Sequence, residues 1–200
     1  MNQNLNKYIF STPNIYNDEE AVELKMKQIH PKLFGLFCPV RYECIKKEKV
    51  YVPYMLLVFN YKITRSSAKA DKGKKGIFDR SGKIGIVFDM NEVHAFHFDL
   101  LDKLEFDKTN TGRLDGRILK GNCSQSEAVK QGEECIKSQY LGRVFHQIPE
   151  LTLDKKVMFY REAWELQLEC RGKSYQKYAY KDNFGAKNEH ISGLKVRLTV

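Results

Sequence analysis

Residues 50–63 read VYVPYMLLVFNYKI, a nearly continuous run of apolar and aromatic residues. Strands that alternate apolar and polar residues have one face in water, whereas a continuous apolar run with many β-branched and aromatic residues is typical of a strand buried on both faces. We therefore predict that 50–63 form a central strand of a sheet. The alternating residues 37–45 and the charged residues 46–49 before this run predict a hairpin, with its turn at 46–49.

Two helices are predicted from capping boxes, in which a polar side chain and a Glu three residues later satisfy the first backbone N–H groups. Asn17 and Glu20 fit this pattern, and apolar residues then recur at helical spacing, so we predict a helix over about 18–30 that ends before Pro31. Ser124 and Glu127 repeat the pattern and predict a second helix to about residue 144. The chain therefore mixes helices with strands.

Further strands follow each helix. Residues 83–98 have strand character with a turn at 89–92, and 151–170 and 173–181 are two more strands separated by 171–173. Residues 194–200 are a last candidate strand. Between them, 64–83 lack a hydrophobic period and predict a long loop, and 99–122 predict a linker with one helical turn at 100–104. The predicted fold class is α+β, with antiparallel sheets packed by two main helices.

The order of these elements is the same in both halves of the chain. We therefore divide it into an N-terminal αβββ-like half, 1–98, a linker, 99–122, and a C-terminal αβββ-like half, 123–200. A lysine-rich turn precedes both Val50 and Val157, and a Gly-Lys pair occurs at Gly82 and at Gly172. Either the αβββ unit is duplicated, with an expanded hairpin tip in the first copy, or two ordinary α+β stretches resemble each other by chance.

Composition excludes several classes of protein. With 200 residues, 42% hydrophobic and 12% aromatic, the chain has the composition of a globular protein and not of a disordered or fibrous one. It shows no secretory signal and no segment near the ~20 apolar residues that span a bilayer. The five cysteines lack CxxC spacing, which favours free thiols over a disulfide framework or a zinc ribbon. We expect a cytoplasmic protein without a membrane partner.

Positive charge gathers in two segments of a chain whose net charge is +9. Residues 62–83 hold eight basic and two acidic residues, and 171–200 hold seven and two. Such segregation favours a polyanion, with nucleic acid the leading candidate, because lysines and arginines release counterions from phosphates. Tyr175, Tyr178, Tyr180 and Phe184 lie among the second set and could stack on bases. The predicted polyanion-binding residues are Arg65, Lys69, Lys72, Lys74, Lys75, Arg80, Lys83, Arg171, Lys173 and Lys177.

Two other functions stay open at this point. Lysines also keep loops and strand edges solvated, so the chain could instead be a structural protein or bind a protein partner, an acidic one included. It could also be a cysteine-dependent enzyme that uses Cys123, which precedes a helix N-terminus where a thiolate is favoured.

Other chemical motifs are weak. No phosphate-binding glycine motif occurs, and on a strand His94 and His97 would point to opposite faces, so no cofactor, metal or catalytic set is predicted. Trp164 shares a face with Leu166 and Leu168, which indicates a core anchor. The resulting hypothesis is a non-catalytic binding module.

Overall fold

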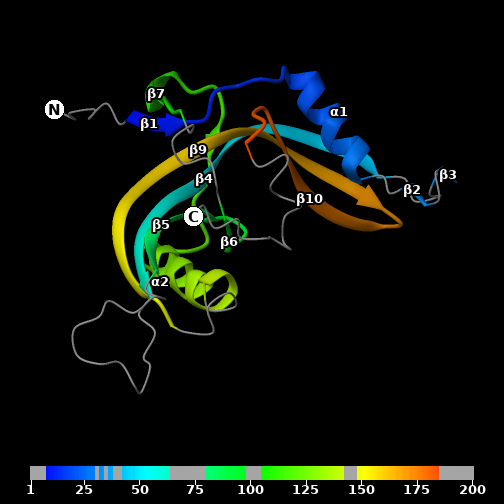
Figure 1. Cartoon of the computed structure of the whole chain (residues 1–200). Helices are drawn as coiled ribbons and strands as arrows, with labels where there is room; N and C mark the ends of the chain where they lie inside the picture. The colour runs from blue at the N-terminus through cyan, green and yellow to red at the C-terminus, as the bar shows by residue number, and fades with distance from the viewer. Residues whose placement is uncertain are drawn as a thin grey trace, which may run out of the picture. The chain divides into compact units, whose positions relative to one another are not determined.

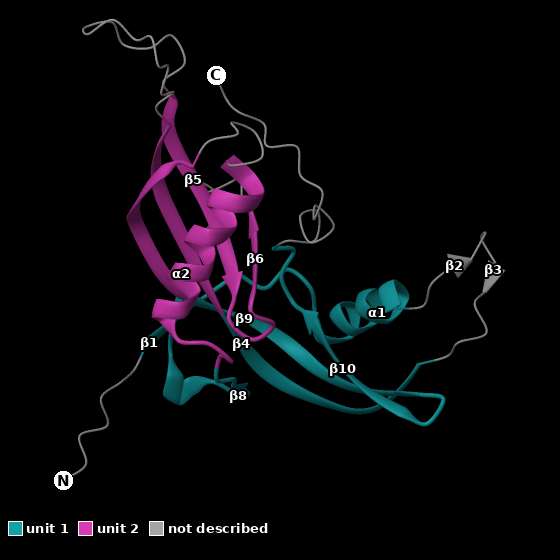
Figure 2. Cartoon of the chain, turned by 90° about the horizontal axis from the view of Figure 1, so that it is seen from below, with its two compact units in different colours: residues 1–53, 105–120, 159–185 teal, residues 54–104, 121–158, 186–200 magenta. Residues whose placement is uncertain are grey.

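The computed structural model describes residues 8–29, 32–33, 36–37, 42–63, 80–97, 105–141 and 148–184. It is a mixed α and β structure made mostly of sheet, in agreement with the predicted α+β class (Figure 1). The chain divides into two compact units, unit 1 with residues 1–53, 105–120 and 159–185, and unit 2 with residues 54–104, 121–158 and 186–200 (Figure 2). Strands β4 (Glu43–Ile63) and β9 (Glu150–Cys170) each belong partly to both units, so the units combine residues from both of the predicted halves 1–98 and 123–200.

Unit 1 is built around the last part of β9. Strand β10 (Lys173–Tyr180) pairs antiparallel with β9, from Lys173 opposite Cys170 to Tyr180 opposite Ala163. Strand β1 (Tyr8–Ser11) pairs antiparallel with β7 (Asp107–Asn110) and meets β9 in parallel at Ser11 and Tyr160. The remaining elements of this unit are helix α1 (Asp18–Ile29), the short hairpin β2 (Lys32–Leu33) and β3 (Leu36–Phe37), the 3-10 turn Thr111–Arg113, and β8 (Arg117–Ile118), which pairs with β4.

Helix α1 begins where the sequence predicts. The Asn17 side chain accepts a hydrogen bond from the Glu20 backbone N–H at 2.9 Å, and the Glu20 carboxylate accepts one from the Asn17 N–H, also at 2.9 Å. This capping box satisfies two N–H groups that a helix start leaves without partners. Apolar residues of α1 then pack on one face of the β9–β10 hairpin; they are Val22, Met26 and Ile29, against Leu166, Leu168 and Ala179.

Unit 2 contains the end of β4, strands β5 (Arg80–Asp89) and β6 (His94–His97), and helix α2 (Gln125–Cys135) with a π-helical turn, Ile136–Leu141. β4 and β5 pair antiparallel from Tyr54 opposite Asp89 to Ile63 opposite Arg80. Ala128 and Ile136 lie in the same buried cluster as Leu57 and Ile86. The helix approaches the strands so closely that a Cβ on Gly132 would lie 2.7 Å from Ile86 Cδ1.

The central strand is buried as predicted, but the hairpin before it is not formed. Residues 50–59 of β4 are all buried, whereas the strand starts at Glu43 and runs straight through the predicted turn at 46–49. The charged residues fit a strand because two of them, on the same face of β4, find partners elsewhere in unit 1. Lys47 lies over the Trp164 ring, and Lys49 forms ion pairs with Asp115 and Glu162.

The remaining strand predictions have mixed outcomes. The turn at 89–92 is confirmed and is closed by Asp89, whose Oδ1 accepts hydrogen bonds from the N–H groups of Asn91 and Glu92 at 2.8 Å. The strands 151–170 and 173–181 are confirmed, and they meet at a turn in which Arg171 and Gly172 have positive φ angles of 51° and 71°. The loop prediction is wrong for residues 80–83, which extend β5 and pair with β4.

The predicted linker also contains paired strands, because β7 and β8 lie within 99–122. The predicted helical turn at 100–104, residues 64–79, the end of the second predicted helix at 142–144, and the candidate strand 194–200 lie outside the described residues. No helix among the described residues is long and apolar enough to cross a membrane.

Candidate nucleic-acid interface

Five of the ten predicted polyanion-binding residues can be placed; Arg65, Lys69, Lys72, Lys74 and Lys75 lie outside the described residues. Arg80 and Lys83 lie on β5 in unit 2, and both are exposed. Lys83 Nζ lies 2.8 Å from Asp154 Oδ2, an exposed ion pair of the kind that contributes little to stability. Arg171, Lys173 and Lys177 lie on the β9–β10 hairpin of unit 1, and all three are exposed.

Side chains along the β9–β10 hairpin alternate between the two faces of the sheet. Lys173, Tyr175 and Lys177 are two apart on β10, so their side chains lie on one face of the sheet. Their antiparallel partners are Cys170, Leu168 and Leu166, which place this face on the side that α1 covers. No acidic residue occurs from 171 to 181. Exposed basic side chains therefore gather at the tip of this hairpin.

Aromatic rings join the lysines on this face. Tyr42 and Tyr175 meet edge to face with ring centroids 5.6 Å apart. The Lys47 ammonium lies 5.3 Å from the centre of the Trp164 ring, and Tyr42 and Trp164 both pack against the buried Leu166 and Leu168. Cations over aromatic rings and edge-to-face ring pairs each stabilise such a surface by about 0.5–1 kcal/mol when exposed. We call this set the lysine–aromatic face; it consists of Tyr42, Lys47, Trp164, Lys173, Tyr175 and Lys177.

At one end of this face, the Glu162 carboxylate of β9 is the centre of a network of ion pairs. Its Oε1 lies 2.8 Å from Lys49 Nζ and 2.9 Å from Lys181 Nζ, and Asn14 donates a hydrogen bond to Oε2 at 2.9 Å. Each lysine has a second carboxylate partner, Asp115 for Lys49 and Asp18 for Lys181, both at 2.8 Å. The network therefore joins strands β4 and β9, and the residue that follows β10, to α1.

The partners of Glu162 control its protonation. Burial alone would raise the pKa of Glu162, but hydrogen bonds from Asn14, Lys49 and Lys181 outweigh it, and the pKa lies below its usual value. The lysines show the converse. Burial would lower the pKa of Lys49 and of Lys181, yet the carboxylates beside them raise both. The network is thus charged at neutral pH, and its lysines are committed to carboxylates rather than to a ligand.

A second buried pair fixes the end of the hairpin. Arg161, 2% exposed, donates to both carboxylate oxygens of Asp182 at 2.8–3.2 Å and to the Phe184 carbonyl at 2.7 Å. Thr12 donates to the same carboxylate, and the Tyr180 ring lies 3.5 Å from the guanidinium carbon. This packing is one reason why the aromatic side chains near the C-terminal basic residues differ in solvent exposure.

Of the four rings proposed from the sequence to stack on bases, only Tyr175 has the exposure that stacking needs. It is 39% exposed, whereas Tyr178 and Phe184 are each 8% exposed. Tyr180 is half-buried under Arg161. Lys47 was not predicted at this surface because residues 46–49 were expected to form a turn, and Tyr42 was placed on the predicted strand 37–45 without a role in binding. No local signal in the sequence places Tyr42 and Lys47 on one surface, because each reaches it through a contact with a distant residue, Tyr175 and Trp164 respectively.

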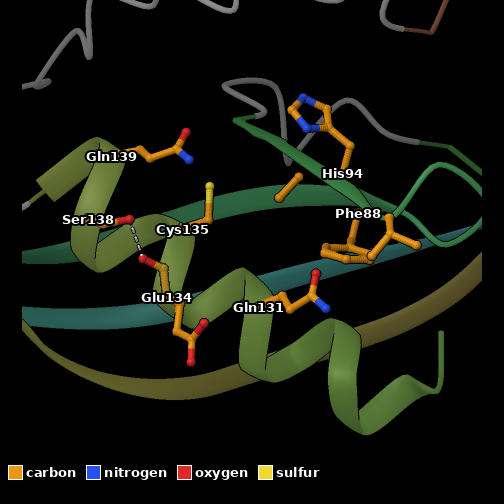
Figure 3. A pocket seen from close by; sticks show the side chains of 9 residues that line it. Phe88, His94, Gln131, Glu134, Cys135, Ser138 and Gln139 are labelled. Atoms are coloured by element: carbon orange, nitrogen blue, oxygen red, sulfur yellow. Dashed lines mark hydrogen bonds between the residues drawn. The ribbon is translucent and has the colours of Figure 1, made fainter.

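Unit 2 has an open pocket of about 430 Å³ beside α2 (Figure 3). Phe88 and His94 line it from the strands, while Glu134, Cys135 and Ser138 line it from the helix, where the Ser138 hydroxyl donates to the Glu134 carbonyl at 2.7 Å. Burial raises the pKa of the Cys135 thiol. Among the described residues, no three His, Cys, Asp or Glu side chains are grouped so that they could hold a metal ion.

Cys123, the candidate nucleophile, lies before α2 in unit 2, and its thiol points to the Met90 carbonyl at 3.8 Å. Burial, followed by the negative charges of Glu127 and Asp89, raises the pKa of Cys123 above its usual value. A raised pKa leaves less thiolate at neutral pH, which is the opposite of what an activated cysteine nucleophile has.

The comparisons with known proteins add no family to this picture. No protein-family model, no curated protein and no solved structure matches the chain.

Proposed function

We propose that this protein is a non-catalytic module that binds nucleic acid or a similar polyanion, with its lysine–aromatic face as one contact surface. The observation that carries the proposal is the β9–β10 hairpin, where the exposed Lys173 and Lys177 flank the exposed ring of Tyr175. Lysines neutralise phosphates, and an exposed ring offers a base a surface to stack on. Because Lys49 and Lys181 are neutralised by carboxylates, these exposed lysines are the ones open to phosphate.

The second contact surface in this proposal is the basic segment 64–83. Its described residues, Arg80 and Lys83, are exposed at the start of β5, and Lys83 shares its charge with the exposed carboxylate of Asp154. The same segment contributes five further basic residues, Arg65, Lys69, Lys72, Lys74 and Lys75, between β4 and β5. The described basic residues at the ends of the β4–β5 and β9–β10 pairs therefore lie near the ends of long antiparallel hairpins.

We further propose that these hairpins are equivalent parts of a duplicated αβββ unit. Asp18 and Gln125, where the helices start, are 107 positions apart, and so are Glu43 and Glu150, and Ile63 and Cys170, which bound β4 and β9. The same spacing superimposes the capping boxes Asn17/Glu20 and Ser124/Glu127, and it matches Glu20-Ala21-Val22 to Glu127-Ala128-Val129. Common spacing of caps, helices and strands supports duplication more strongly than the thin sequence identity does.

The packing of each unit supports the same proposal. In unit 1 the helix α1 packs on the β9–β10 hairpin, and in unit 2 the helix α2 packs beside the β4–β5 hairpin. Each helix thus covers the hairpin of the other proposed copy, as in intertwined or domain-swapped repeats. On this alignment the paired residues Ile63 and Arg80 correspond to the paired residues Cys170 and Lys173. The second copy connects its two strands with Arg171 and Gly172 alone, so residues 64–79 count as an insertion in the first copy.

The function is tested by titrating a labelled single-stranded oligonucleotide, and its duplex, into the full chain at low salt. We expect Lys173→Glu/Lys177→Glu, and separately Lys72→Glu/Lys74→Glu/Lys75→Glu, to weaken binding by about tenfold or more, because a reversed charge repels the phosphate that it formerly neutralised. The control for the first variant is Lys27→Glu/Lys137→Glu, which changes the net charge equally but at two lysines that already pair with Glu23 and Glu133.

The proposal is wrong if the wild-type chain does not bind at low salt. It is also wrong for the lysine–aromatic face if Lys173→Glu/Lys177→Glu binds as tightly as the control variant. Full competition by polyglutamate at equal charge would identify an acidic protein as the partner instead, because a peptide chain offers carboxylates but no bases.

A further inference from the structure

The β1–β7 ribbon of unit 1 carries two large aromatic side chains in water. Tyr8 is 54% exposed and Phe10 is 44% exposed, and because they are two apart on β1 their rings lie on the same face. Ile9 between them is buried, so the opposite face of β1 is turned toward the protein. A soluble chain seldom places neighbouring aromatic residues in water without a use for them.

A lysine belongs to the same exposed face. In the antiparallel register Phe10 lies opposite Lys108 of β7, and residues directly opposite in such a pair share a face of the sheet. The Lys108 ammonium lies 4.6 Å from the centre of the Tyr8 ring. Asp107, the residue before Lys108 on β7, lies on the other face. The exposed face of the ribbon therefore combines two rings with a positive charge.

The Phe10 ring is held by a series of contacts between aromatic rings. Phe10 meets Phe106 edge to face at 6.3 Å, and Phe106 lies 4.9 Å from Phe159, which is fully buried in β9. Phe159 in turn meets Phe184 at 5.6 Å. A contact chain that leads from the surface ring to the core restricts the ring before any ligand arrives. A pre-ordered ring loses less entropy on binding than a free one.

We infer that the β1–β7 face binds unpaired bases of single-stranded nucleic acid, with Tyr8 and Phe10 as stacking surfaces and Lys108 beside a phosphate. This inference rests on the proposed function and narrows it to single strands. In a duplex each base is stacked on its neighbours and its face is closed, whereas in a single strand the face is open to an aromatic side chain. A sheet surface with exposed rings and a lysine supplies both stacking and charge.

The test compares three probes on the full chain at low salt: a single-stranded thymidine oligonucleotide, a DNA duplex, and inorganic polyphosphate, which has charge but no bases. Tyr8→Ala/Phe10→Ala is expected to weaken single-strand binding by about fivefold or more, since the loss of a stacked base is worth at least ~1 kcal/mol. Its affinity for polyphosphate should stay within about twofold of wild type, because no charge has changed.

Two matched variants separate stacking from unfolding. Tyr8→Phe/Phe10→Tyr keeps both rings and should keep the single-strand affinity. Leu24→Ala removes an apolar side chain of similar exposure, 41%, from α1 and should change neither affinity nor melting temperature. Melting curves of all variants show whether Tyr8→Ala/Phe10→Ala is folded.

The outcomes distinguish this inference from the function on which it rests. Single-strand binding that Tyr8→Ala/Phe10→Ala leaves within about twofold of wild type overturns the stacking surface while the proposed polyanion binding stands. If the wild-type chain binds single strand, duplex and polyphosphate with equal affinity, the stacking surface is likewise overturned and the proposed polyanion binding stands. Failure of the wild-type chain to bind any of the three probes overturns both.

Discussion

The Glu162 carboxylate is the centre of the charge network in unit 1, and Glu162→Gln would remove its charge while keeping its shape. Removing one partner of a fully buried ion pair costs about 3–5 kcal/mol, because the other partner is left buried without a counter-charge. Here the side chains of Lys49 and Lys181 are 17% and 12% exposed, and they keep Asp115 and Asp18 as second partners. We therefore expect a smaller loss of unfolding free energy, about 2–3 kcal/mol.

The expected loss depends on pH with a definite sign. The folded-state pKa of Glu162 lies below its ordinary value, so its contribution to stability is complete above the unfolded pKa of about 4.3 and disappears as the pH falls through the folded pKa. Glutamine does not titrate. The difference in stability between wild type and Glu162→Gln should therefore be largest near neutral pH and should shrink in acid.

Urea unfolding followed by Trp164 fluorescence measures this difference, because Trp164 is the only tryptophan and belongs to unit 1. Glu169→Gln is the control, since Glu169 lies on the same strand but is exposed and should change stability by less than about 0.5 kcal/mol. In a thermal scan the Glu162→Gln loss corresponds to roughly 4–12 °C for a chain of this size. If Glu162→Gln is as stable as Glu169→Gln at neutral pH, or if the difference grows in acid, the network does not stabilise the fold as argued.

Three further outcomes follow from the packing and the site. Gly132→Ala should destabilise unit 2 by about 1–2 kcal/mol in urea, because its Cβ would lie 2.7 Å from Ile86 Cδ1 and 2.9 Å from Leu57 Cδ1; the stabilisation usual for Ala in a helix would contradict this packing. Replacement of 64–79 by Asn-Gly should leave the melting temperature nearly unchanged but weaken polyanion binding, and a chain that fails to fold would contradict the proposed equivalence of the two hairpin tips. Cys123 and Cys135 should react with iodoacetamide more slowly at neutral pH than the exposed Cys44, as mass spectrometry of the alkylated peptides can show, and faster reaction of Cys123 would instead favour the enzyme hypothesis.

Local signals in the sequence predicted the elements whose causes are local. The capping boxes at Asn17 and Ser124 mark the starts of both helices, and the hydrogen bonds that define them join residues three apart. The turn at Asp89 and the turn at Gly172 are likewise closed within a few residues. The burial of 50–59 follows from a run of apolar residues that have no alternative to the core.

Features that depend on distant partners could not be predicted. Residues 46–49 look like a turn because four charged residues are adjacent, whereas the partners that they meet in the strand, Asp115, Glu162 and Trp164, lie far later in the sequence. The candidate site shows the same limit. Basic composition pointed to 171–177, but pairing of β1 with β7 was needed to bring Tyr8, Phe10 and Lys108 to one surface. Tyr178 and Phe184 were misjudged because their burial depends on packing contacts with other strands.

The salt dependence of nucleic-acid binding tests the central claim most directly. The affinity of the wild-type chain for a single-stranded oligonucleotide is measured from about 50 to about 200 mM salt, in parallel with Lys173→Glu/Lys177→Glu. If these lysines contact phosphates, the logarithm of the affinity falls linearly with the logarithm of the salt concentration, and the variant loses about 1.4 from the slope, at ~0.7 for each lost contact. A wild-type affinity that does not change with salt, or an identical slope in the variant, would contradict polyanion binding at the lysine–aromatic face.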